Sequence, residues 1–70
     1  MNLKEYLKMG MNPIGYRVSQ KDIQGRIILM RSVPGGITND FMISIRWDND
    51  TRLHTWAFGT LPENIEIFVN

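Results

Sequence analysis

The chain has 70 residues, enough for one domain with a thin hydrophobic core. Its 8 basic and 7 acidic residues give a net charge of +1, which is not the composition of a strongly cationic nucleic-acid-binding protein. It contains no cysteine, so disulfides and thiolate metal sites are excluded. No apolar run is long enough for a membrane span or a secretory signal, and we therefore expect a cytoplasmic protein with no membrane partner.

A short helix is predicted over residues 2–8. Asn2 can cap it, Leu3, Tyr6 and Leu7 share one face at helical spacing, and Gly10 can end it. Two helical turns are not stable alone in water. We therefore expect residues 1–12 to form a helical extension that docks on the rest of the chain.

The first two predicted strands cover residues 16–19 and 26–31, with a polar loop at 20–24 between them. Apolar side chains occupy both faces of the second strand. We therefore expect the N-terminal helix to cover part of its outer face. The longest predicted loop follows at residues 32–40, around the flexible pair Gly35-Gly36.

The clearest pattern in the chain is a hairpin between residues 41 and 58. Phe41, Ile43, Ile45 and Trp47 alternate with more polar residues, as expected for a half-buried antiparallel strand, and this alternation predicts Trp47 in the core. The run Asp48-Asn49-Asp50 predicts the turn, because short polar side chains tolerate turn backbones.

The returning strand is ambiguous. Its large side chains, His54, Trp56 and Phe58, alternate with Leu53, Thr55 and Ala57, and either set could face inward. If the small set faces inward, Trp56 and Phe58 form an exposed apolar strip. If the large set does, His54 is half-buried and there is no strip.

A helical turn at residues 60–64 and a strand at 65–69 complete the pattern. Five short strands, a long loop and this turn predict an all-β protein. The expected architecture is a single domain over residues 1–70. It comprises the N-terminal helix, a five-stranded barrel at residues 15–69 and a 3-10 turn before the last strand.

Several segments carry a resemblance to the SH3-like small β-barrels of the Tudor, KOW and mind-bomb type. They are Gly15-Tyr16-Arg17-Val18, Gly25-Arg26-Ile27, the strand end from Ile43 to Asn49, Trp56, and Glu63-Asn64-Ile65-Glu66-Ile67. The chain departs from that pattern at Asp50, where many relatives have glycine, and in its N-terminal helix. The resemblance implies a fold and a binding role rather than a reaction.

Catalytic and metal sites find little support in the sequence. His54 is the only histidine, and a catalytic role would need Asp48 or Asp50 to orient it and a nucleophile such as Ser44 on the same side. The carboxylates lack the spacing of zinc or calcium ligands. We therefore predict no enzymatic activity, no cofactor and no metal.

The leading functional prediction is a non-catalytic protein-binding module, such as an accessory or inhibitor protein of bacteria, phages or plasmids, acting as a monomer or homodimer. Aromatic side chains would anchor the partner and an arginine would direct hydrogen bonds to it. The predicted partner-binding residues are Trp56, Phe58, Arg46, His54 and Tyr16.

The sequence also fits two other functions. A nucleic-acid-binding domain would use basic residues with one aromatic side chain: Arg17, Arg26, Arg31 and Arg46 with Trp56. The type II dihydrofolate reductases are oligomeric enzymes that this chain resembles in barrel pattern only. Their "VQIY" motif has no counterpart here, where His54-Thr55-Trp56-Ala57 stands.

Overall fold

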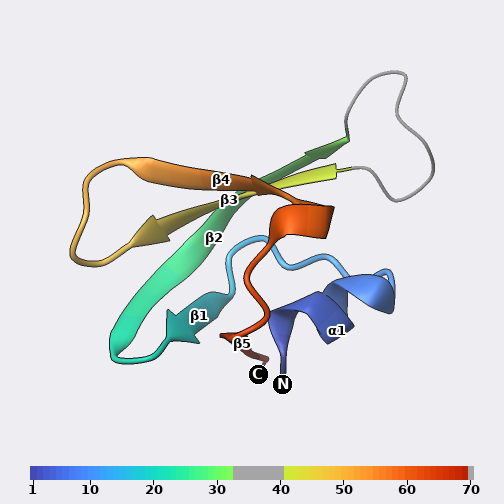
Figure 1. Cartoon of the computed structure of the whole chain (residues 1–70), viewed down its shortest axis with the longest axis horizontal. Helices are drawn as coiled ribbons and strands as arrows, with labels where there is room; N and C mark the ends of the chain where they lie inside the picture. Colours follow the sequence, from blue (N-terminus) through green and yellow to red (C-terminus); the bar gives the residue numbers. More distant parts are fainter. Residues whose placement is uncertain (33–40, 70) are drawn as a thin grey trace.

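The computed structural model describes residues 1–32 and 41–69. The described residues form one antiparallel sheet of five strands in the order β4-β3-β2-β1-β5, with a short helix and a 3-10 turn (Figure 1). The predicted all-β class is therefore confirmed. The predicted loop with Gly35-Gly36 lies outside the described residues. The elements are α1 Leu3–Lys8, β1 Arg17–Gln20, β2 Ile23–Ser32, β3 Phe41–Trp47, β4 Leu53–Ala57, η1 Phe58–Thr60 and β5 Ile65–Phe68.

The N-terminal helix forms and docks as predicted. The Asn2 side chain accepts a hydrogen bond from the Glu5 backbone N–H, and Gly10 follows the helix with a φ of 77°. The apolar face of α1 is buried, and the helix packs beside β5. Within residues 1–32 and 41–69, no helix is long and apolar enough to cross a membrane.

The connection between β1 and β2 is tighter than the predicted loop at residues 20–24. Gln20 pairs with Ile23, so the turn contains only Lys21 and Asp22. Lys21 adopts a φ of 57°, the left-handed conformation that closes such a turn. Polarity alone suggested a loop, but Ile23 and Gln24 belong to the strand.

A β-bulge interrupts the alternation of β2. The register with β3 shifts between Ile27 and Leu29. Ile27 is fully buried, whereas Ile28 and Leu29 are each 40% exposed. The expectation that the N-terminal helix covers this outer face is therefore wrong, since α1 lies beside β5 instead.

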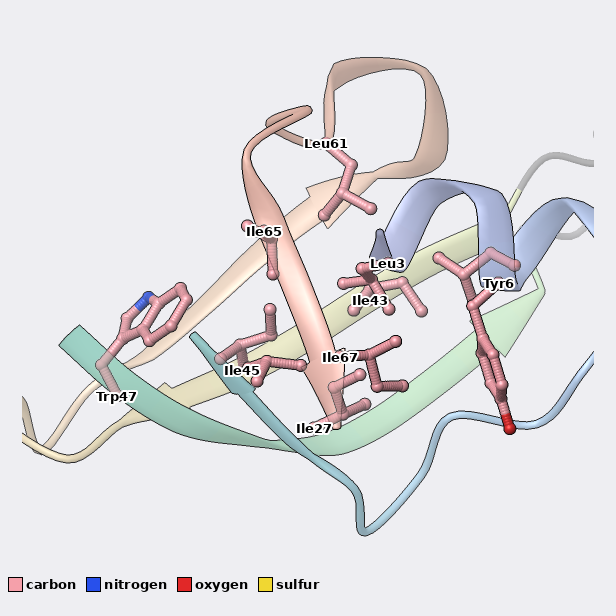
Figure 2. Close-up of a cluster of buried hydrophobic side chains, with 11 residues drawn as sticks. Leu3, Tyr6, Ile27, Ile43, Ile45, Trp47, Leu61, Ile65 and Ile67 are labelled. Carbon is pink, nitrogen blue, oxygen red and sulfur yellow. The ribbon is translucent and has the colours of Figure 1, made fainter. Parts of the chain in front are cut away.

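The core lies between the inner face of the sheet, α1 and the segment before β5. Figure 2 shows isoleucines from β2, β3 and β5 at its centre, with Trp47 at one end and Tyr6 at the other. Trp47 is 5% exposed, which confirms its predicted core position. The buried apolar residues are Leu3, Tyr6, Leu7, Val18, Ile27, Ile43, Ile45, Trp47, Leu61, Ile65 and Ile67.

The 3-10 turn before the last strand is confirmed, but it begins at Phe58 rather than at residue 60. The Leu61 backbone N–H donates to the Phe58 carbonyl, and the Thr60 hydroxyl donates to the Ala57 carbonyl. Leu61, only 2% exposed, enters the core directly after the turn. Burial of this leucine fixes where the turn ends.

Candidate functional site

The β3–β4 register decides which way the returning strand faces. His54 pairs with Ile45 and Trp56 pairs with Ile43, and both isoleucines are fully buried. Cross-strand partners share a face of the sheet, so His54 and Trp56 lie on the core side. Both are half-buried, while Leu53 on the other face is 45% exposed. The large set therefore faces inward, and no strip of exposed aromatic side chains forms.

The three predicted aromatic anchors pack against aromatic neighbours within the chain. The Trp56 ring meets Trp47 edge to face, with ring centroids 6.4 Å apart. The other two pairs are Phe58 with Phe41 at 4.9 Å and Tyr16 with Tyr6 at 6.1 Å. Burial, and then the neighbouring Tyr16, raises the pKa of the Tyr6 hydroxyl above its ordinary value of 10.0.

Arg46 lies on the opposite face from Trp56 and His54. It is exposed, and its cross-strand partners are Arg26 on β2 and Leu53 on β4. The structure therefore does not bring the five predicted partner-binding residues to one surface. Their role in binding stays a prediction.

The outer face instead carries a row of arginines that crosses three strands. Arg17 pairs with Arg26, and Arg26 pairs with Arg46, so the three side chains stand side by side on β1, β2 and β3. We name Arg17, Arg26 and Arg46 the arginine row. An exposed apolar residue flanks the row at each end. Phe68 on β5 pairs with Arg17, and Leu53 on β4 pairs with Arg46.

Only one member of the arginine row is neutralised by a carboxylate among the residues that the structure describes. A terminal nitrogen (Nη2) of Arg17 lies 2.7 Å from Asp48 Oδ2 and 3.2 Å from Gln24 Oε1. Arg26 and Arg46 have no ion-pair partner in residues 1–32 and 41–69. Like charges directly opposite each other destabilise a sheet. Binding of an anion from outside the chain would therefore relieve the repulsion between Arg26 and Arg46.

A hollow of about 600 Å³ opens beside the row. Its lining combines positive charge with apolar surface from Ile28, which the β-bulge leaves 40% exposed. Two carboxylates, those of Asp48 and Asp50, also line it. The lining residues are Arg17, Arg26, Ile28, Arg46, Trp47, Asp48, Asp50 and Thr51. Such a surface suits a ligand that is both acidic and apolar.

The β3–β4 turn holds a compact polar cluster around Asp50. The Arg52 backbone N–H donates to Asp50 Oδ1 at 3.0 Å, and His54 Nε2 lies 3.0 Å from Asp50 Oδ2. These contacts, led by the Arg52 N–H and followed by His54 and the Arg52 side chain, hold the pKa of the Asp50 carboxyl well below its ordinary value of 3.8. Asp50 also lines the hollow, so the cluster fixes the turn that contributes to this lining.

The catalytic arrangement considered for His54 is not assembled. Ser44 pairs with Thr55, and their hydroxyls lie 2.9 Å apart on the face opposite His54. In the part of the chain that the structure describes, no three His, Asp or Glu side chains gather as metal ligands.

The sequence predicts one possible basic surface from Arg17, Arg26, Arg31 and Arg46, and the structure aligns three of these: Arg17, Arg26 and Arg46. Nothing local in the sequence shows this alignment, because it depends on register. The available signal was the placement of one arginine on the outer face of each of three consecutive strands.

Comparisons of the chain with models of protein families, with curated proteins and with solved structures find no match.

Proposed function

We propose that this chain is a non-catalytic protein-binding module that holds an acidic, partly apolar segment of its partner on the arginine row. The observation that carries the proposal is the cross-strand pair Arg26 and Arg46, two exposed like charges without an ion-pair partner among the described residues. The pair is unfavourable in the free protein and becomes favourable when carboxylates bind.

We further propose that the five-stranded sheet is a small barrel of the SH3-like type. The supporting feature is the path of the chain. Strands β1 to β4 follow one another as neighbours, and β5 returns after a 3-10 turn to pair with β1. Domains of this architecture serve many functions, so the binding proposal rests on the surface and not on the fold.

A protein partner is favoured over nucleic acid by the side chains around the row. Exposed neighbours are mainly aliphatic, Ile28 and Leu53, with Phe68 at the far end. Trp56, the aromatic residue considered for base stacking, lies on the core side of β4. Arginine together with exposed apolar residues is typical of protein interfaces. Surfaces that bind single-stranded nucleic acid instead present several exposed aromatic rings on which the bases stack.

The test compares two labelled probes at physiological salt: a nine-residue peptide that alternates glutamate with valine, and a nine-nucleotide single strand of thymidine. We expect the peptide to bind more tightly, as measured by fluorescence anisotropy. The double variant Arg26→Gln/Arg46→Gln should weaken peptide binding about ten-fold or more.

The control variant Lys8→Gln/Lys21→Gln removes two positive charges outside the row and should bind as the wild type does. Equal weakening by both double variants would mean that only net charge matters, which would overturn the proposal. Tighter binding of the oligonucleotide would replace it with the nucleic-acid function.

A further inference from the structure

The two edges of the sheet differ in how they are covered. At the β5 edge, the Ile67 backbone N–H donates to the Met1 carbonyl at 2.8 Å, and Asn2 bridges to Glu66. At the other edge, β4 has β3 as its only strand partner in the described part of the chain (Figure 1). Its five residues, LHTWA, include no lysine or proline of the kind that blocks exposed edges.

Backbone alternation identifies the groups that line the β4 edge. The Asp48 N–H donates to the Gln24 carbonyl at 2.8 Å, so the backbone groups of Arg46, two residues earlier, also face β2. Those of Ile43 and Ile45 therefore face β4. There they meet the partners of these two residues, Trp56 and His54.

The remaining residues of β4 must then direct their backbone groups away from the sheet. Those residues are Leu53, Thr55 and Ala57. The Ala57 carbonyl accepts the Thr60 hydroxyl at 3.0 Å, as expected for a group on the outer edge. The N–H and C=O groups of Leu53 and Thr55 form the part of the edge that a further strand could use.

We infer that β4 accepts an extended acidic segment of the protein partner as a sixth strand. This inference rests on the function proposed above. Charge complementarity selects this occupant. A partner residue opposite Leu53 would extend the line of the arginine row, two strand spacings or about 10 Å from Arg46. An arginine side chain reaching toward a glutamate spans that distance.

A second copy of this chain fits the edge less well. Pairing β4 with β4 would bring no carboxylate to the arginine row, because residues 53–57 contain no acidic side chain. It would also place the rows of both copies on one continuous sheet, adding like charges. An acidic strand from a different protein avoids both problems.

The test uses two variants at Thr55 and the glutamate–valine peptide described above. Thr55→Pro removes one outward N–H, at an edge position where proline is tolerated. Thr55→Val keeps that N–H, and both variants lose the hydroxyl that contacts Ser44. We expect Thr55→Pro to weaken peptide binding roughly ten-fold and Thr55→Val to leave it within about two-fold. Thermal unfolding of both variants checks that each is folded.

Amide hydrogen exchange provides a second measurement on the unmodified protein. Bound peptide should slow exchange at Leu53 and Thr55 far more than at His54 and Trp56, whose N–H groups already face β3. If the peptide binds and requires Arg26 and Arg46, yet the Thr55→Pro variant binds normally and neither edge amide is protected, strand addition is wrong while the proposed function stands. If the peptide does not bind at all, both are wrong. Self-association through β4, seen as a dimer that Thr55→Pro dissociates, would overturn the choice of occupant.

Discussion

Consecutive residues on β2 and β3 build two faces with opposite properties. Ile27 pairs with Ile45 on the inner face, and both are fully buried. One residue away, Arg26 pairs with Arg46 on the outer face, and both are exposed. The inner pair stabilises the sheet by burial, while the outer pair opposes it by charge repulsion. The comparison indicates that the inner pair contributes to stability, whereas the outer pair leaves two positive charges exposed.

The largest effect should come from a cavity in the inner face. Ile45→Ala removes a fully buried side chain and should lower the free energy of unfolding by about 2–5 kcal/mol. A domain of this size has only roughly 4–10 kcal/mol in total. Urea denaturation measures the loss. Ile45→Val, as a control, should cost about 0.5–1.5 kcal/mol, and an alanine variant as stable as this control would contradict the assigned core.

The next effect tests how closely β2 and β3 approach. A Cβ atom at Gly25 would lie 2.6 Å from the Arg46 carbonyl oxygen and 2.8 Å from the Trp47 ring. Gly25→Ala should therefore lower the free energy of unfolding by about 1–3 kcal/mol and change the tryptophan emission. Gly59→Ala is the matched control, since within residues 1–32 and 41–69 no atom beyond Gly59 and its chain neighbours lies within 4 Å of the added Cβ. Equal midpoints in thermal unfolding would show that the approach is not this close.

A smaller effect concerns acid stability at the turn that joins β3 and β4. Because the folded protein lowers the pKa of Asp50 below 3.8, its carboxylate stabilises the fold above that pH. This stabilisation is lost as the pH falls below 3.8 toward the folded-state pKa. Unfolding followed from about pH 5 to about pH 2 should therefore show a steeper loss for the wild type than for Asp50→Asn. Parallel curves would contradict the role of the Arg52 and His54 contacts.

The smallest effect on stability should have the opposite sign. Arg46→Glu replaces a repulsive cross-strand pair with an attractive one and should raise the free energy of unfolding by about 0.2–1 kcal/mol. The same change should weaken binding of the glutamate–valine peptide. Arg46→Gln serves as the control, with a smaller gain in stability. A loss of stability in Arg46→Glu would show that the arginine row is held by contacts within the chain.

Local patterns were sufficient to predict most of the fold. The alternation around Ile43 and Ile45 predicts β3, and the Asn2 cap with Gly10 predicts α1, because each signal lies within a few residues. The bulge at Ile28 could not be predicted, since a run of four apolar residues carries no alternation to interrupt. It depends instead on pairing with β3, which is a contact between distant residues.

The candidate site was harder to predict because both of its features are properties of register. His54 and Trp56 alternate with Leu53 and Thr55, and hydrophobicity alone does not distinguish the two sets. Pairing with Ile43 and Ile45 decides the matter. The register of β3 with β2 likewise aligns Arg46 with Arg26, 20 positions away in the chain, and one residue of slippage would separate them.

The hydrogen bond from Ile67 to Met1 has a consequence for how this protein folds. Strand β5 lies between β1 and the first two residues, so the last of the five described strands to be synthesised is enclosed by segments made much earlier. A nascent chain that lacks β5 exposes one side of β1 and leaves α1 without the strand beside which it packs. Contacts between such distant positions slow folding, and final closure must wait until residue 67 has emerged from the ribosome.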